Sequence, residues 1–306
     1  MTRASGITRE AGNTNYRATD VQVRGGMLHT GIWGPEDSAA PTILAVHGVT
    51  ASHKAWPYLA EALPDVRIIA PDLRGRGRSN GLPAPYGMPS HAEDLAAVLA
   101  ALTTGPVVVV GHSMGGFVAV VLANMFPERV RSLVLVDGGL PLQVPDGLSD
   151  EEIVAAVLGP AAERLKATFP SREVYRSFWR QHPAFSHDWG PLVEAYVDYD
   201  LTGEEPELRP STRYQAMAED TAELHRGASL LKALDELAVD TEVLRAPRGL
   251  LNEPSGLYAP GYLDAWAEKL PDLRIREVPE VNHYTIVMGE AGAAAVAESV
   301  RTALAR

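Results

Sequence analysis

Short apolar runs and amphipathic segments alternate along most of the chain. The runs cover residues 42–47 (TILAVH), 66–71 (VRIIAP), 106–111 (PVVVVG) and 132–136 (SLVLV). Continuous apolar runs of this length are typical of strands that are buried on both faces of a parallel sheet. Ahead of them, the pattern over residues 20–33 predicts a hairpin that turns at Gly25 and Gly26.

Helical patterns separate these strands. The clearest covers residues 90–102, with Ser90 as a candidate N-cap and Glu93 as its capping-box partner. Two more helices are predicted over 54–63 and 114–126. Strands that alternate with helices imply parallel βαβ units, so we expect an α/β fold with an open sheet and helices on both faces.

The alternation stops over residues 138–238, where we find helical patterns and no strand pattern. The predicted helices cover 149–158, 171–181, 189–199 and 211–235, and strand patterns return over 241–246 and 273–278, each followed by a helix. We therefore predict two domains, a core of residues 1–138 and 239–306 and a helical cap of residues 139–238.

Aromatic residues of the predicted cap, among them Trp179 and Trp189, fit a lid above an apolar pocket. They fit equally well the packing of a small core within the cap itself.

Charge and composition narrow the range of partners. The 306 residues carry a net charge of −12, from 27 basic and 39 acidic side chains. This charge argues against a non-specific partner of nucleic acid or of an anionic membrane. The chain has no cysteine, which excludes disulfides, thiolate metal ligands and a cysteine nucleophile.

The beginning of the sequence, MTRASGITREAGNTNYRATD, lacks the apolar segment of a signal peptide. No run approaches the roughly 20 apolar residues that span a bilayer. We expect a cytoplasmic protein, and the sequence leaves a homodimer open.

The valine run ends in the motif Gly111-His112-Ser113-Met114-Gly115, which matches G-x-S-x-G. In this motif a strand turns sharply into a helix and leaves the serine hydroxyl exposed, while small residues on both sides let the backbones approach. The N–H groups of the new helix point to the place where an oxyanion would form. Ser113 is therefore the candidate nucleophile; the alternative is a glycine-rich turn with a structural role only.

A serine hydroxyl needs a base to become a nucleophile. Of the nine histidines, His283 lies in the loop between the last predicted strand and the C-terminal helix. Such loops gather at the carboxyl edge of a parallel sheet, where Ser113 is also expected. We predict His283 as the base and expect the side chain of His112 to point away across the turn. The remaining candidates are expected at the surface or in the cap: His91, His182, His187 and His225.

With these motifs the chain resembles the α/β-hydrolase superfamily over nearly its whole length. The motifs that carry the resemblance are HG at 47–48 followed by Val49, PDLRGRGRS at 71–79, GHSMGG at 111–116, LVLVDGG at 133–139 and NHYTI at 282–286. The resemblance implies an eight-stranded, mostly parallel sheet with a cap inserted after the sixth strand. It also implies that the backbone N–H groups of Val49 and Met114 form the oxyanion hole.

The third member of a Ser-His-acid triad is open between two positions. In many relatives the acid follows the seventh strand, but here that place falls near Gly249, and the nearest carboxylate is Glu253. The other known position is directly after the sixth strand, where Asp137 stands. This spacing resembles haloalkane dehalogenases and fungal-toxin lactonases. We favour Asp137, whose structural alternative is a helix or turn cap, and keep Glu253 as the alternative acid.

Further residues receive supporting roles. Asp72 is expected to hold the glycine-rich turn through Arg74 or Arg76, and phosphate binding by these arginines is the less favoured alternative. His47 is expected to brace the oxyanion loop. Candidates for the pocket mouth, against plain packing, are Ser52, His53 and Trp56. The predicted substrate-binding residues are Gly48, His53, Leu140, Trp189 and Tyr284.

These residues predict a serine hydrolase that acts on a medium-sized apolar ester or lactone and uses no metal or organic cofactor. A macrocyclic lactone of the mycotoxin type is the specific hypothesis. Serine at this position disfavours dehalogenase and epoxide hydrolase activity, which use an aspartate. The alternatives are a carbon–carbon bond hydrolase, a perhydrolase, a peptidase that uses Glu204, Glu205 or Glu207, and a non-catalytic ligand receptor of the same fold.

Overall fold

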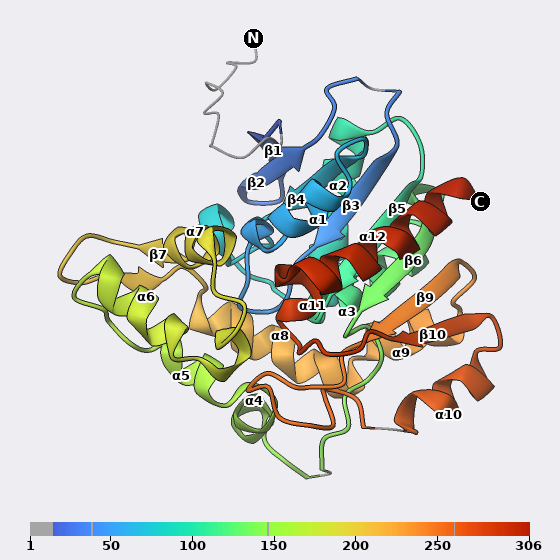
Figure 1. Cartoon of the computed structure of the whole chain (residues 1–306). Helices are drawn as coiled ribbons and strands as arrows, with labels where there is room; N and C mark the ends of the chain where they lie inside the picture. Colours follow the sequence, from blue (N-terminus) through green and yellow to red (C-terminus); the bar gives the residue numbers. More distant parts are fainter. Residues whose placement is uncertain (1–14, 38, 146, 260) are drawn as a thin grey trace.

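The computed structural model describes residues 15–37, 39–145, 147–259 and 261–306. Eight strands form one sheet in the order β1-β2-β4-β3-β5-β6-β9-β10 (Figure 1). β2 is antiparallel to its two neighbours, β1 and β4, and the other pairings in this sheet are parallel. The strands are β1 (Arg17–Val23), β2 (Gly26–Trp33), β3 (Thr42–Val46), β4 (Arg67–Pro71), β5 (Val107–His112), β6 (Val130–Val136), β9 (Asp240–Arg245) and β10 (Leu273–Glu277).

The four apolar runs form β3, β4, β5 and β6 in the middle of the sheet. Successive side chains of a strand point to opposite faces, so both faces of these strands need apolar cover. In β5, Val107 and Val109 belong to one hydrophobic cluster and Val108 and Val110 to the other. The predicted hairpin is present, but Gly26 pairs with Val23, so the turn lies one residue earlier than expected.

Helices cover both faces of the sheet (Figure 1). One hydrophobic cluster contains side chains of α2 (Met88–Leu102), α3 (Met114–Met125), α9 (Ala228–Asp235) and α10 (Tyr262–Lys269). The other contains side chains of α1 (Pro57–Ala62), α11 (Thr285–Met288) and α12 (Glu290–Ala305). None of the helices in the described part of the chain has both the length and the apolar character needed to cross a membrane.

The start of α2 differs from the prediction. The helix begins at Met88 after Gly87, so Ser90 lies inside its first turn and the capping box with Glu93 does not form. Its free N–H groups find partners in a distant helix instead: Gly87 N–H donates to Asp220 at 2.6 Å and Met88 N–H to Glu223 at 2.9 Å. Tertiary contacts have replaced the local cap.

Two other predicted helices are divided. The first 3₁₀ turn (η1) covers His53–Ala55, and α1 starts at Pro57, because proline suits a first helical position. The long segment predicted over 211–235 splits at Gly227 into α8 (Tyr214–Arg226) and α9.

Between β6 and β9 the chain is mainly helical, and its first helices gather at the carboxyl ends of the parallel strands (Figure 1). These helices are α4 (Asp150–Leu158), α5 (Pro160–Arg164), α6 (Arg172–Arg180) and α7 (Pro191–Tyr199). Two short strands, β7 (Leu201–Thr202) and β8 (Arg209–Pro210), were not predicted. Leu230 and Leu234 of α9 join the cluster that contains α3, so α9 covers the sheet. The predicted division into core and cap stays a prediction.

A buried ion pair joins α8 to the turn that follows β4, and a histidine of α2 contacts the same carboxylate. The carboxylate of Asp220 contacts the guanidinium of Arg76 and, at 2.9 Å, Nε2 of His91. The side chains of all three residues are fully buried. A buried charge that loses its partner is far more costly than an exposed one, so Asp220 is expected to matter for stability.

We expect Asp220→Ala to lower the free energy of unfolding by about 3–5 kcal/mol, because it leaves the Arg76 guanidinium buried and unpaired. Urea denaturation measures this change. The matched control is Asp235→Ala, which removes an exposed carboxylate 2.7 Å from Lys269 and is expected to cost about 0–1 kcal/mol. Equal losses in the two variants would contradict this role of Asp220.

Candidate active site

Ser113 lies at the corner between β5 and α3 in a backbone conformation that is rare for a non-glycine residue, with φ 53° and ψ −128°. Two hydrogen bonds hold the corner: Ser113 N–H donates to the Val136 carbonyl at 2.9 Å, and Gly116 N–H donates to the Ser113 carbonyl at 2.8 Å. The arrangement matches the strained turn that exposes the serine in G-x-S-x-G motifs.

The glycines of the motif are required by close backbone contacts. A Cβ atom on Gly111 would lie 2.3 Å from the carbonyl oxygen of Gly115. One on Gly115 would lie 2.1 Å from the carbonyl oxygen of Val46, and one on Gly138 would lie 2.1 Å from that of Ser113. A larger residue at any of these positions would push β3, β5 or the loop after β6 away from the corner.

His283 pairs with a buried carboxylate. Its Nδ1 lies 2.7 Å from Oδ2 of Asp137, whose side chain is fully buried. The other oxygen, Oδ1, accepts the Ala246 N–H at 3.1 Å, which fixes the carboxylate. Because the carboxylate accepts from Nδ1, the ring proton sits there and Nε2 is left to act as a base.

The alternative acid, Glu253, does not approach His283. Its exposed carboxylate accepts the N–H of Leu251 at 2.7 Å. The loop folds back on itself, with Gly249 N–H donating to the Glu253 carbonyl at 2.8 Å. Of the two candidate acids, Asp137 is therefore the one whose carboxylate contacts the histidine.

His112 does not point away across the turn as expected. Its Nε2–H donates to the backbone carbonyl of His283 at 2.8 Å, and the two ring centroids lie 4.8 Å apart. Burial holds the pKa of His112 well below its usual range, and the nearby His283 lowers that pKa further to a smaller extent. A neutral His112 thus supports the backbone of His283, which lines the same cavity as Ser113.

His47 braces the loop that precedes Val49. Its Nε2 accepts the Leu73 N–H at 2.9 Å, so Nδ1 carries the proton and donates to the Gly48 carbonyl at 2.8 Å. Burial lowers the pKa of His47 to about 4, so the ring stays neutral. In a trans peptide the N–H points opposite to the carbonyl, so this bond directs the Val49 N–H to the other side of the loop.

That loop lies against the serine. A Cβ atom on Gly48 would come within 3.1 Å of the Ser113 Cβ. Met114 is the first residue of α3, so its N–H has no acceptor within the helix. Val49 lines the same cavity as Ser113, and the oxyanion hole formed by the N–H groups of Val49 and Met114 stays a prediction.

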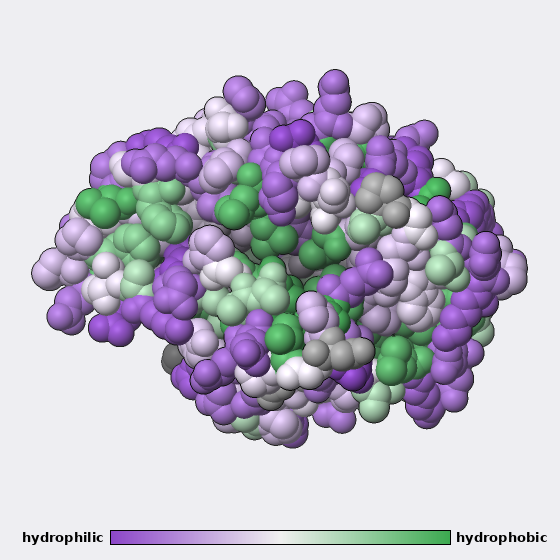
Figure 2. Space-filling model, turned by 90° about the horizontal axis from the view of Figure 1, so that it is seen from below, coloured by the Kyte–Doolittle hydropathy of each residue, from purple (hydrophilic) through white to green (hydrophobic). Residues whose placement is uncertain are grey.

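Ser113 and His283 line one small cavity of about 30 Å³. Two of the five predicted substrate-binding residues, Gly48 and Tyr284, line it as well. Residues that were not predicted complete the wall: Leu158, Ala161, Tyr196, Leu250 and Met288. Leu158 ends α4 and Ala161 lies in α5, so these two wall residues come from the two sides of the break at Gly159. Figure 2 shows a hollow bordered by hydrophobic residues on the face of the molecule seen from below.

The other predicted substrate-binding residues do not line this cavity. Leu140 is fully buried, and the Tyr258 hydroxyl bonds its backbone carbonyl at 2.8 Å. The guanidinium of Arg180 lies over the ring of Trp189, with Cζ 5.2 Å from the ring centroid. His53 is buried against Asp72, with Nδ1 2.9 Å from Oδ1.

Ser52 and Trp56, the other two candidates for the pocket mouth, do not line the catalytic cavity either. Ser52 caps the 3₁₀ turn, and Trp56 is fully buried. Ala51 and Ala55 line the cavity instead. The 3₁₀ turn rotates the larger side chains away from the cavity.

Asp72 holds the glycine-rich turn, but not through the arginine side chains. Its Oδ2 accepts the Arg78 backbone N–H at 2.8 Å and the Tyr199 hydroxyl at 2.6 Å. Arg74 and Arg76 pair with Asp94 and Asp220. Both guanidiniums are fully buried and paired with carboxylates, an arrangement that argues against the phosphate site.

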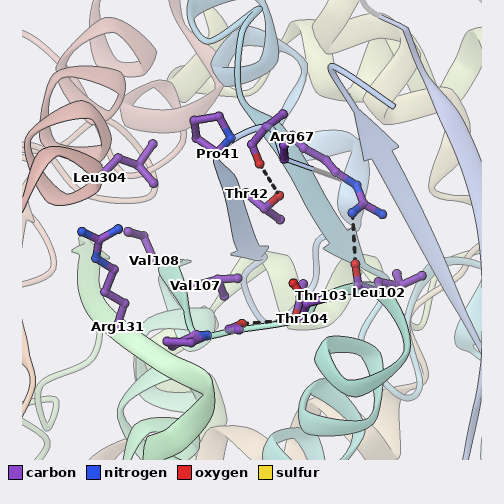
Figure 3. Close-up of a pocket in the computed structure, with 14 residues that line it drawn as sticks. Pro41, Thr42, Arg67, Leu102, Thr103, Thr104, Val107, Val108, Arg131 and Leu304 are labelled. Atoms are coloured by element: carbon purple, nitrogen blue, oxygen red, sulfur yellow. Dashed lines mark hydrogen bonds between the residues drawn. The ribbon is translucent and has the colours of Figure 1, made fainter. Parts of the chain in front are cut away.

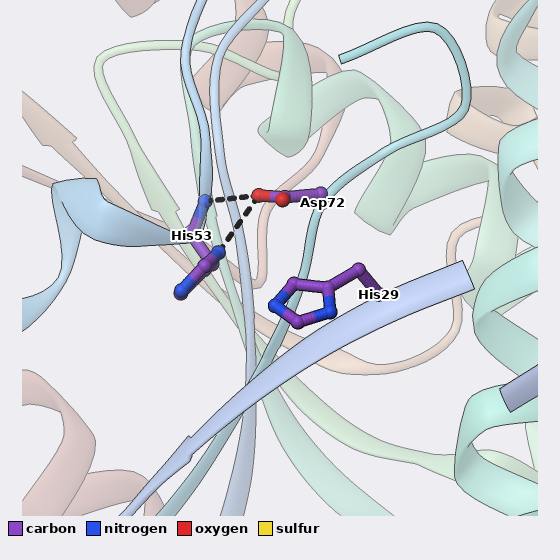
Figure 4. A group of neighbouring side chains, drawn as sticks. All are labelled: His29, His53 and Asp72. Atoms are coloured by element: carbon purple, nitrogen blue, oxygen red, sulfur yellow. Dashed lines mark hydrogen bonds and ion pairs between the residues drawn. The ribbon is translucent and has the colours of Figure 1, made fainter. Parts of the chain in front are cut away.

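One group of side chains in the described part of the chain has the spacing of metal ligands: His29, His53 and Asp72, with ligand atoms within 4.8 Å of one another (Figure 4). Both nitrogens of His53 already have partners, because Nδ1 bonds Asp72 and Nε2 lies 2.8 Å from the Tyr16 hydroxyl. A metal would have to displace these buried bonds. The group is better explained as a hydrogen-bond network that joins β2, η1 and α7.

Comparison with known proteins agrees with this geometry. A family model described as the alpha/beta hydrolase fold matches residues 41–242. Lipase LipV of Mycobacterium tuberculosis is 44% identical over 131 residues, which cover 43% of this chain and 48% of the lipase. The 2-(acetamidomethylene)succinate hydrolase of Mesorhizobium japonicum is 26% identical over 250 residues, 81% of this chain and 84% of that enzyme. The chain thus matches about half the length of the lipase.

Solved structures show the same fold. The crystal structure of E-2-(acetamidomethylene)succinate hydrolase superposes with a TM-score of 0.78 and 20% identity, covering 95% of this chain and 100% of the other. The thioesterase domain from the curacin biosynthetic pathway gives a TM-score of 0.73 and 22% identity, covering 94% and 99%. With the family match over residues 41–242, these findings establish that the chain belongs to the alpha/beta hydrolase family.

Proposed function

We propose that this alpha/beta hydrolase is a serine hydrolase that cleaves carboxylic esters through an acyl-enzyme on Ser113. The observation that carries the proposal is the presence of the strained Ser113 and the Asp137-bonded His283 in one cavity. A nucleophile, a base and a carboxylate that orients the base are the parts that acyl transfer needs.

In the proposed reaction, Nε2 of His283 takes the proton from the Ser113 hydroxyl as Oγ attacks the ester carbonyl. The N–H groups of Val49 and Met114 donate to the oxyanion of the tetrahedral intermediate. The C–O bond then breaks, and the alcohol leaves with the proton from His283. Water attacks the acyl-enzyme by the same route, returns its proton through His283 and releases the acid.

The buried Asp137 stabilises the imidazolium that forms in each half of the reaction. Serine as the nucleophile favours attack at a carbonyl carbon and disfavours displacement at saturated carbon, which aspartate performs in dehalogenases.

The cavities support a medium-sized apolar substrate. The catalytic cavity, of about 30 Å³, holds little more than the reacting group. A second cavity of about 310 Å³ shares Leu250 with it and is lined in part by Leu142, Val157 and Leu257. We propose that the ester carbonyl sits at Ser113 and that an apolar tail extends past Leu250. An apolar lactone, including a macrocyclic one, is the finer version of this proposal.

A second candidate comes from a relative that this chain matches over 84% of the relative's length. That enzyme is named 2-(acetamidomethylene)succinate hydrolase, so a substrate of that kind belongs in any assay. Carbon–carbon bond hydrolysis and perhydrolysis use the same residues. The peptidase proposal loses its support, because the exposed Glu204, Glu205 and Glu207 do not line the catalytic cavity.

A cytoplasmic location, the absence of nucleic-acid and membrane partners, and a homodimer remain predictions. The net charge of −12 supports the predicted absence of nucleic-acid and membrane partners.

We expect the protein to hydrolyse p-nitrophenyl esters and Ser113→Ala to abolish this turnover, because the variant lacks the nucleophile. Release of p-nitrophenol, measured over aliphatic esters and lactones together with 2-(acetamidomethylene)succinate, tests this. Absence of both turnover and covalent labelling by a fluorophosphonate in the unchanged protein would contradict the enzyme and favour the ligand receptor.

The carboxylates are distinguished by two isosteric variants. Asp137→Asn is expected to lower kcat by about 10⁴-fold, because the amide favours the wrong histidine tautomer. Glu253→Gln, the comparison variant, is expected to change kcat far less, since its carboxylate accepts the Leu251 N–H and does not contact His283. Equal kcat values for the two variants would exclude Asp137 as the triad acid.

Leu250→Ala is expected to join the two cavities. The ratio of kcat/KM for octanoyl over butanoyl p-nitrophenyl esters should rise at least roughly tenfold, since burial of about two of the four extra methylenes, at about 0.8 kcal/mol each, already gives that factor. Leu251→Ala is the control, because Leu251 is exposed beside it. An unchanged ratio in Leu250→Ala, with hydrolysis intact, would refute the role of Leu250 without affecting that of Ser113.

A further inference from the structure

Another cavity, distinct from the two described above, lies at the amino ends of the parallel strands, opposite to Ser113. It has a volume of about 340 Å³, within the range of small-molecule sites. Its walls contain residues from the beginnings of four parallel strands, namely Thr42 of β3, Arg67 of β4, Val107 of β5 and Arg131 of β6. Figure 3 shows Arg67 and Arg131 reaching this cavity from opposite sides.

Arg67 is half-buried and incompletely bonded. Its Nη1 donates to the Leu102 carbonyl at 3.0 Å, while its Nε is buried and has no hydrogen-bond partner within the described ranges. Burial lowers its pKa, and no neighbouring carboxylate opposes that effect. A desolvated guanidinium with an unmet donor is stabilised by an anion.

Arg131 has an exposed side chain with no ion pair or hydrogen bond to the residues that the structure describes. The acidic residues nearest in sequence to the two arginines are engaged elsewhere. Asp65 binds Arg301 at 2.8 Å, and Glu128 lies 3.6 Å from Arg129. No aspartate or glutamate lines the cavity. Two guanidiniums without counter-charges thus face one cavity in a chain with 39 acidic and 27 basic residues.

The wall between the arginines includes aliphatic side chains, among them Val107, Val108 and Leu304. The hydroxyl of Thr42 donates to the Ala40 carbonyl at 3.0 Å, and that of Thr103 to the Leu99 carbonyl at 2.8 Å. Charged donors at the two sides and apolar surface between them match a molecule with anionic ends and a short hydrocarbon middle.

We propose that this cavity binds a small organic dicarboxylate, with one carboxylate on Arg67 and the other on Arg131. Carboxylates accept two N–H groups of a guanidinium at once, which gives such pairs their geometry and strength. The site is separate from the catalytic cavity. The first residue of β5, Val107, lines the proposed dicarboxylate site, and the strand ends one residue before Ser113, which lines the catalytic cavity. At about 3.3 Å per residue, the six residues of β5 separate the two sites by roughly 20 Å.

The test is isothermal titration calorimetry of the full chain with succinate, with inorganic phosphate as a second anion. We expect one succinate to bind per chain, and Arg131→Gln to raise Kd at least about tenfold, because a charge-assisted bond is lost. Arg131 is exposed, so this variant keeps its fold; Arg67→Gln is expected to give the same loss.

The matched control is Arg180→Gln, which removes an exposed arginine paired with Glu173 and Glu194 and is expected to leave Kd unchanged. Succinate binding that survives in Arg131→Gln, or that weakens equally in Arg180→Gln, would overturn the assignment. So would phosphate binding that is tighter than succinate binding, because a single anionic centre would then suffice.

Discussion

The corner between β5 and α3 depends on close contact between backbone atoms that only glycine permits. The carbonyl oxygens of Val46 and Gly115 occupy the space in which Cβ atoms of Gly115 and Gly111 would stand. This contact brings β3, β5 and the start of α3 together and holds Ser113 at a positive φ. A strained residue of this kind costs about 1–3 kcal/mol and persists only where the surrounding structure determines it. The valines of β5, buried on both faces, provide that surrounding structure.

Buried neutral histidines connect the site to the rest of the fold. His47 links Leu73 to the oxyanion loop, and His112 supports the backbone of His283. Burial lowers the pKa of both rings, so each works as a hydrogen-bond connector and not as a charge. His53 behaves likewise between Tyr16 and Asp72, whose second oxygen receives the hydroxyl of Tyr199 from α7. The loops around Ser113 are thereby tied to the helices that cover it.

The two edges of the sheet have different chemistry. At the carboxyl edge, neutral or paired polar groups surround a small apolar cavity, which suits a reaction at an uncharged carbonyl. At the amino edge, two guanidiniums without carboxylate partners line a larger cavity. The parallel arrangement explains this separation, because every parallel strand places its start at one edge and its end at the other. A ligand at one edge therefore leaves the other accessible.

The sequence by itself determined the features that depend on chain neighbours. Apolar runs predicted the central strands, the glycine spacing predicted the corner at Ser113, and the order of motifs pointed to His283. Long-range partners were decided only by the tertiary structure. Asp137 and Glu253 were both compatible with the sequence, and the tertiary structure placed Asp137, after β6, beside His283 in the loop after β10. In the same way, Asp220 took the place of the Ser90 cap, and Leu158, Tyr196 and Leu250 came to line the cavity. Local periodicity reports which face of an element is apolar, whereas hydrogen-bond and cavity partners are set by elements distant in the chain.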